Sequence, residues 1–268
     1  MKSYMILGRE GIGMHTPAAH FPRLLTVNNL KILKSLGLGY RTYALHLAPA
    51  TRGGAEMCHW RSAGCTAACL NLSGHGGMIP KSTGTNAVQE ARKRRTQFFN
   101  NDRELFMQTL VQDIRDGSTR ALKDGLIPVF RLNTTSDVLW ERIPVTVNGH
   151  TFNNVFEVFP DTQFYDYTKA PLGMRQYSKP DNYHLTFSLS ESNEQRARAC
   201  AAAGMNIAVV FRKKPFPETF WGLKVVDGDE TDLRFLDPKG VIVGLKAKGP
   251  GRKDYSGFVQ DIKEVVFV

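Results

Sequence analysis

Residues 40–69, YRTYALHLAPATRGGAEMCHWRSAGCTAAC, determine how the sequence of this 268-residue chain is interpreted. The stretch from Tyr40 to Ala48 predicts a β-strand, because larger apolar side chains alternate with other side chains until Pro49 ends the pattern. Three of the four cysteines in the chain follow at once, at Cys58, Cys65 and Cys69. The sequence therefore predicts a cysteine-bearing loop directly after a strand.

The cysteine triplet predicts a metal centre. Four cysteines in 268 residues are too few for a disulfide scaffold, so we expect reduced thiols and a cytoplasmic protein, in the cytoplasm of a host cell. Thiolates are soft donors that suit a 4Fe-4S cluster, which is the favoured interpretation, or zinc, which is the alternative. Zinc would need a fourth donor, for which His59 and His75 are the nearest imidazoles.

Composition limits the other functions. The net charge of +10 favours anionic partners, so nucleic acid is a second candidate partner beside a small anionic ligand. We expect no membrane partner, because no run of about 18 apolar residues occurs. The length and the apolar content predict a single domain over residues 1–268, with an irregular or helical segment at 1–39 packed on a barrel-like core at 40–268.

Strands and helices are expected to alternate along the chain. Helical spacing of apolar residues predicts helices over 24–36, 86–99 and 102–125, the last with Asn101 and Glu104 as a capping pair, and a further helix runs from Ser192 to Gly204. Strands are predicted at residues 40–48, 127–133, 164–168, 183–189, 206–212, 223–227 and 241–246. This order predicts an α/β fold, a complete or partial (β/α) barrel of mostly parallel strands.

Polar side chains at the ends of these strands are the candidate ligand-binding residues. In a helix-wrapped barrel the outer face meets the helices, so the polar members of each alternating strand are expected to point inward. An antiparallel sheet with one wet face would give the same alternation. The candidate ligand-binding residues are Arg131, Asn133, Ser188, Ser190, Glu191, Asp227 and Lys248, and the candidate catalytic residues are Lys246 and Asp137.

Two resemblances add expectations. A three-cysteine loop after the first barrel strand resembles the radical S-adenosylmethionine superfamily, although gaps of six and three residues between the cysteines are wider than is usual there. The likeness implies a 4Fe-4S cluster with one open iron and makes S-adenosylmethionine a candidate cofactor. The segments CHWRSAGCTAACLNLSGHG, RLNTTSDVLWE and VVDGDETDLRFLDPKGVIVGLKAKG resemble the phage and plasmid family called gene product 88, which implies a bacteriophage or other mobile-element origin.

Two classes of function remain at this point. The first is an iron-sulfur protein of a mobile genetic element whose cluster lies at the carboxyl-terminal face of the barrel, next to a polar, cationic pocket. Enzyme activity, as an iron-sulfur lyase or a radical-SAM-like enzyme, and a redox or iron sensor without turnover are both compatible with it. The second class is a zinc-binding module that binds nucleic acid.

Overall fold

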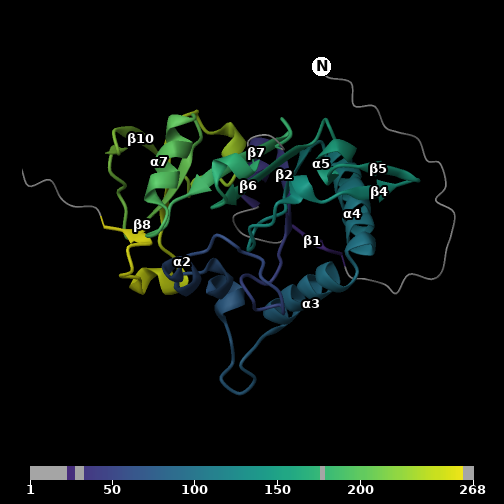
Figure 1. Cartoon of the computed structure of the whole chain (residues 1–268), viewed down its shortest axis with the longest axis horizontal. Coiled ribbons are helices and arrows are strands. Elements are labelled where there is room, and N and C mark those ends of the chain that lie inside the picture. Colours follow the sequence, from purple (N-terminus) through teal and green to yellow (C-terminus); the bar gives the residue numbers. More distant parts are fainter. Residues whose placement is uncertain (1–22, 28–32, 176–178, 262–268) are drawn as a thin grey trace, which may run out of the picture.

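The computed structural model describes residues 23–27, 33–175 and 179–261 (Figure 1). Ten strands form one sheet in the order β1-β2-β3-β6-β7-β8-β11-β10-β9, with β12 also paired to β8. The strands of this sheet are β1 (Leu25–Thr26), β2 (Tyr40–Leu45), β3 (Ile127–Arg131), β6 (Gln163–Thr168), β7 (Tyr183–Ser188), β8 (Ile207–Phe211), β9 (Thr219–Phe220), β10 (Leu223–Asp227), β11 (Ile242–Lys246) and β12 (Val259–Gln260).

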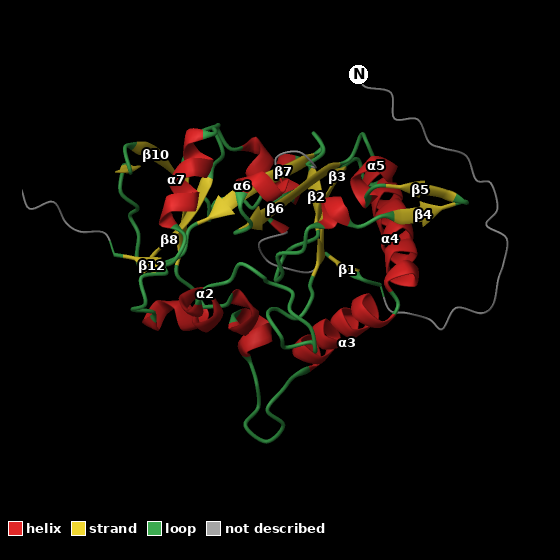
Figure 2. Ribbon diagram, in the orientation of Figure 1, coloured by secondary structure: helices red, strands yellow, loops and turns green. Residues whose placement is uncertain are grey.

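Helices of very different length surround the sheet (Figure 2). The α-helices are α2 (Ala63–Ala67), α3 (Ala87–Asn101), α4 (Arg103–Lys123), α5 (Val155–Val158), α6 (Leu172–Arg175) and α7 (Glu194–Ala202). The 3-10 helices are η1 (Leu36–Leu38), η2 (Leu70–Leu72), η3 (Gly74–Gly77), η4 (Trp140–Arg142), η5 (Arg234–Leu236) and η6 (Gly249–Lys253). The expected alternation of strands and helices is confirmed.

The sheet is largely parallel but open, so the predicted α/β fold with mostly parallel strands is confirmed, while a closed barrel is wrong. Strands β2, β3, β6, β7, β8, β11 and β10 pair in parallel. Among the described residues the two edges are β1 and β9, which pair antiparallel with β2 and β10 and are two residues long. A short antiparallel strand at each edge ends the parallel series, and the sheet does not close on itself.

Helices α3 and α4 follow from local sequence signals. Asn86 caps α3 by accepting a hydrogen bond from the backbone N–H of Gln89 at 3.0 Å. Asp102, and not Asn101 as predicted, caps α4 by accepting from Leu105 N–H at 3.1 Å. Helix α4 packs on β2 and β3, and at Gly117 an added Cβ would come within 3.1 Å of the Tyr43 ring. The glycine therefore allows the helix to approach the sheet closely.

Helix α7 covers the same face of the sheet farther along. Ala197 and Cys200 are buried against Phe187 of β7 and Ile207 of β8, which are pairing partners in the sheet. The helix ends as predicted, since Gly204 takes a φ of 82°.

The opposite face of the sheet is covered by the chain after β10. Leu233 packs on Val129 and Tyr165, and Arg234 is fully buried beneath this face. Arg131 on the same face forms a buried ion pair with Asp232. The sheet is thus buried on both faces.

This second layer explains why one expected orientation is wrong. Arg131 and Ser188 lie, as predicted, on the face that the chain after β10 covers. Strand pairing places Val243 of β11 on this face as well, beside Ala208 of β8, which pairs with Ser188 of β7. Lys246 pairs with Phe211 on the other face and is exposed. The alternation in β11 therefore places Val243, and not Lys246, on the face that the segment after β10 covers.

Two further differences concern short elements. Residues 25–26 form β1 where a helix was expected over 24–36, and residues 28–32 of that range lie outside the described residues, as does 1–22 of the expected 1–39 segment. The antiparallel hairpin of β4 (Val145–Val147) and β5 (His150–Phe152) was not predicted. Its turn is Asn148-Gly149, both with positive φ, as a two-residue hairpin favours.

In the part of the chain that the structure describes, no helix combines the length and the apolar character that a membrane crossing needs.

The ion pair beneath the sheet should be important for stability. We expect Asp232→Asn to lower the free energy of unfolding by about 3 kcal/mol, because it removes the closer counter-charge of the buried Arg131 guanidinium and leaves only Asp166, at 3.9 Å. Asp227→Asn is the matched control, since Asp227 pairs with Lys214 at the surface and should cost less than about 1 kcal/mol. Urea unfolding followed by circular dichroism measures both. Equal losses in the two variants would contradict the assignment.

Candidate metal centre

The cysteine loop connects β2 to α3 and lies at the carboxyl ends of the parallel strands. Figure 2 shows α2, within this loop, and α3 along one end of the sheet. Every loop that follows a parallel strand emerges at this end, so residues far apart in the sequence meet the loop here.

Two of those loops contact the cysteine loop. After β3, Thr135 donates its hydroxyl to the carbonyl of Leu47 at 2.6 Å, and Asp137 N–H donates to the carbonyl of Met57 at 2.7 Å. After β11, an added Cβ on Gly249 would come within 2.2 Å of Ser73 Oγ.

Glu191, in the loop after β7, anchors the segment that carries Cys65. Its carboxylate accepts hydrogen bonds from Ser62 Oγ at 2.8 Å and from Gly64 N–H at 2.7 Å. Ser62 in turn caps α2 by accepting from Cys65 N–H at 3.1 Å. At Gly64 a side chain would clash, because Ser256 Oγ lies 2.1 Å and Glu191 Oε2 2.8 Å from the position of an added Cβ.

Backbone N–H groups point at two of the three sulfurs. Ala50, with an unusual φ of 51°, donates to Cys58 Sγ at 3.5 Å, and the Cys58 thiol donates to the carbonyl of Thr135 at 3.8 Å. The N–H of Asn71 bonds the sulfur of Cys69. Such N–H···S bonds are one means by which proteins stabilise thiolate bound to a cluster.

Four cationic side chains act electrostatically on the thiols: Arg61 on Cys58 and Cys65, and Arg52, Arg92 and Lys169 on Cys69. Arg92 donates to both the backbone and side-chain oxygens of Asn71, at 3.0 and 2.6 Å. Positive groups that act on a thiol favour thiolate and any anionic group that thiolates hold.

Burial opposes ionisation of the same thiols. It raises the pKa of Cys58 to about 12, and it raises the pKa of Cys69 above its usual value. Each of the three thiols also acts electrostatically on the others, so they lie near one another. All three are free, and the fourth, Cys200, is buried on α7.

The donor arrangement bears on the kind of metal group. Within residues 23–27, 33–175 and 179–261, no three or more His, Cys, Asp or Glu side chains are grouped to hold one metal ion. Three thiolates on a single zinc, with Zn–S bonds of about 2.3 Å, would have their sulfurs within about 4 Å of each other. In a cluster each cysteine binds a different iron, so the sulfurs stand farther apart. His59 and His75, the candidate fourth donors to zinc, are both exposed.

The predicted residues after β3 have structural partners. Asp137 accepts hydrogen bonds from Thr168 Oγ1 and Lys169 N–H, both at 2.8 Å, and forms an ion pair with Arg175 at 3.1 Å. Asn133 is buried and accepts from Ser136, Val138 and Trp140, which closes its own loop. Both residues therefore fix the loop after β3, in which the carbonyl of Thr135 accepts the hydrogen bond from the Cys58 thiol.

Among the other predicted ligand-binding residues, Ser188 accepts a hydrogen bond at 2.9 Å from Lys169 Nζ, the cation that acts on Cys69. The Oγ of Ser190 is buried without a hydrogen-bond partner. Arg131 lies in its ion pair with Asp232 beneath the sheet.

The predicted residues at β10 and β11 gather in a group of their own. Lys248 Nζ donates to Asp229 at 2.7 Å, and Lys246 donates its backbone N–H to the same carboxylate at 2.9 Å. Asp227 pairs with Lys214. These contacts do not join Lys246, Lys248 or Asp227 to the cysteines.

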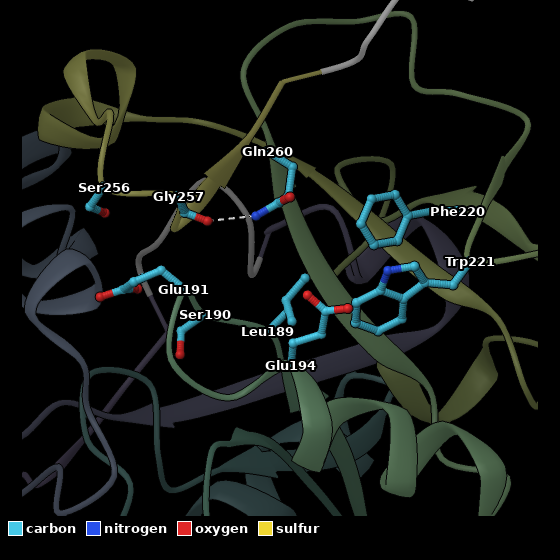
Figure 3. Close-up of a pocket in the computed structure, with 9 residues that line it drawn as sticks. All are labelled: Leu189, Ser190, Glu191, Glu194, Phe220, Trp221, Ser256, Gly257 and Gln260. Carbon is cyan, nitrogen blue, oxygen red and sulfur yellow. Dashed lines mark hydrogen bonds between the residues drawn. The ribbon is translucent and has the colours of Figure 1, made fainter.

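A cavity of about 300 Å³ opens beside the cysteine loop, and its walls are not cationic (Figure 3). Its lining residues are Leu189, Ser190, Glu191, Glu194, Phe220, Trp221, Ser256, Gly257 and Gln260. The set contains two carboxylates and no lysine or arginine, which differs from the cationic pocket expected from the sequence.

Sequence reasoning missed the four cations around the thiols. Arg52 and Arg61 lie within a few residues of Cys58, and this closeness was an available signal. Arg92 lies on α3, 23 residues after Cys69, and Lys169 comes from a loop 100 residues after Cys69. Only the fold brings Lys169 to the site.

A family model described as Gene product 88 matches residues 23–262. The chain therefore belongs to the gene product 88 family, as the sequence resemblance indicated. No curated protein and no solved structure matches the chain.

Loss of the Glu191 anchor should loosen the cysteine loop without unfolding the sheet. We expect Glu191→Gln to weaken the hydrogen bonds to Ser62 and Gly64 and to speed amide exchange of Cys65 at least tenfold, while amides of β7 and β8 stay protected. Glu194→Gln, at an exposed carboxylate three residues away, is the control. Unchanged exchange at Cys65 would show that Glu191 is not an anchor.

His46, which follows β2, should make stability depend on acid. Burial, together with the guanidinium groups of Arg92, Arg131 and Arg95, lowers the pKa of His46 to about 3. In the unfolded chain the imidazole of His46 becomes protonated near pH 6.5, whereas in the folded chain it stays neutral. The free energy of unfolding therefore falls as the pH drops below about 6.5.

Between pH 6.5 and 4.5, we expect the free energy of unfolding of His46→Gln to fall by about 2 kcal/mol less than that of the parent. Urea unfolding at each pH measures this difference. His75→Gln, at an exposed histidine, is the control and should lose as much as the parent. A parent-like loss in His46→Gln would contradict the assignment.

Proposed function

We propose that this gene product 88 protein binds a 4Fe-4S cluster through Cys58, Cys65 and Cys69. The observation that carries the proposal is the combination of three neighbouring free thiols with N–H groups aimed at Cys58 and Cys69 and four cations around them. An iron-sulfur cluster bound to three thiolates is anionic, and this surrounding compensates its charge.

The arrangement of donors supports a cluster over the alternative, a zinc-binding module that binds nucleic acid. The described side chains do not converge as one ion requires, and His59 and His75, the expected fourth donors to zinc, are exposed. Part of the positive charge that suggested nucleic acid, at Arg52, Arg61 and Arg92, acts on the thiols instead.

We further propose a radical-SAM-like use of the cluster. Its support is the position of the cysteine loop, directly after β2, the first parallel strand of the sheet, at the carboxyl ends of all seven. A cluster held by three cysteines has one iron free to bind a small ligand, such as S-adenosylmethionine, or to act as a Lewis acid. The residues of this chain would hold the cluster, exclude water from Cys58 and balance its charge.

The metal content of purified protein tests the proposal. Protein prepared without oxygen should be brown and contain about four iron and four sulfide per chain, because three thiolates and the surrounding cations retain the cluster. Cys65→Ser should lose at least nine tenths of the iron. Cys200→Ser, at a buried cysteine on α7, is the matched control and should keep it.

A colourless protein with one zinc per chain, or equal iron loss in both variants, would overturn the proposal. Electron resonance on the reduced protein tests the finer step. A changed signal on adding S-adenosylmethionine supports the radical-SAM-like use, and an unchanged signal excludes it while leaving the cluster assignment intact.

A further inference from the structure

We infer that the acidic cavity beside the cysteine loop is a binding site for a small cationic molecule that carries a flat ring. The cavity, of about 300 Å³, lies between the loop after β7, the β9–β10 turn and residues 256–260. This inference does not depend on the metal, because none of the lining residues is a cysteine.

The charge of the cavity is opposite to that of the chain. Glu191 and Glu194 are the only ionisable residues among the nine that line it, in a protein with a net charge of +10. Arg198 offsets part of the charge of Glu194, but Glu191 accepts hydrogen bonds from the neutral donors Ser62 and Gly64 and keeps its charge, so this concave wall attracts a cation and repels an anion. The site therefore differs in ligand chemistry from the cationic surroundings of the thiols.

The aromatic wall supplies a surface for a ring. In Figure 3 the rings of Phe220 and Trp221 and the carboxylate of Glu194 lie on one side of the cavity, with Glu191 and Ser256 on the other. Arg198 shows which chemistry this wall accepts, because its guanidinium stacks on Trp221 at 4.2 Å and pairs with Glu194 at 2.8 Å.

Trp221 occupies a backbone position that does not favour tryptophan. Trp221 and Gly222 form the two-residue turn between β9 and β10, and both have positive φ, 57° and 77°. Asn-Gly is the preferred pair for such a turn, while a bulky residue at the first position is strained. Strain of this kind is concentrated at binding sites, where the side chain is needed.

An unpartnered polar group also lines the cavity. Ser190 is 2% exposed, and its Oγ has no hydrogen-bond partner within the described structure. A buried hydroxyl without a partner is costly, and a ligand that offers a donor or acceptor here would satisfy it.

Benzamidine and benzoate test the inference, because they share a ring and a shape but carry opposite charges. In a ¹⁵N-labelled full-length chain, benzamidine should shift the indole N–H of Trp221, identified by its loss in Trp221→Asn, with low millimolar affinity. Benzoate should leave this signal in place. The Asn-Gly pair of Trp221→Asn suits the turn, so loss of binding in this variant, followed by the backbone amides of Glu191 and Gly257, reports the ring and not the fold.

Variants that remove a charge test whether the cation binds at Glu194. We expect Glu194→Gln to bind benzamidine at least threefold more weakly, and Arg198→Gln to bind it about twofold more tightly, because Arg198 competes for the same carboxylate. Glu104→Gln, at an exposed carboxylate on α4, should bind as the parent does.

Equal shifts with benzoate, or unchanged affinity in Glu194→Gln, would overturn the inference. Cys65→Ala separates it from the cluster proposal, because that variant should lose iron and keep benzamidine binding. Loss of iron-sulfur content in the parent protein would leave the cavity result unaffected.

Discussion

Parallel pairing is the constraint on which this molecule depends. Seven neighbouring strands run in one direction, so seven loops leave the sheet at one end and must pack against each other there. The loop between β2 and α3 is the longest of them that the structure describes in full, and it is ordered by its neighbours. Thr135 and Asp137 hold it from the loop after β3, and Glu191 holds it from the loop after β7.

Glu191 is shared by two features of this end of the sheet. One side of the residue binds Ser62 and Gly64 in the cysteine loop, and the residue also forms part of the wall of the acidic cavity. The two features contrast in charge, since cations act on the thiols while carboxylates line the cavity. A molecule in the cavity would therefore lie one side chain away from the segment that carries Cys65.

Much of the fold could be predicted from the sequence. Apolar alternation located β2, β3, β6, β7, β8, β10 and β11, and helical spacing located α3, α4 and α7, because apolar side chains of these elements pack in the core. The edges could not be predicted from pattern, since β1 and β9 have two residues each. The hairpin at Asn148-Gly149 was a signal in the sequence that was overlooked.

The site was predicted less completely, for a physical reason. The three cysteines stand out by type and spacing, but a residue such as Lys169 reaches them only through the fold. The inward direction predicted for Lys246 was wrong, because it assumed a closed barrel with a polar interior. In the open sheet, the chain after β10 covers that face with Leu233 and Arg234, and Lys246 lies on the other face, beside Phe211. Whether the predicted residues bind metal or ligand stays a prediction.

The positive side chains that act on the thiols would also affect the electron affinity of a group bound there. Reduction adds negative charge to whatever the three sulfurs hold, and Arg52, Arg61, Arg92 and Lys169 would stabilise that added electron. The N–H groups of Ala50 and Asn71 act in the same direction. A cofactor in this loop would thus have a higher reduction potential than the same cofactor in a neutral loop, and would accept electrons from weaker donors.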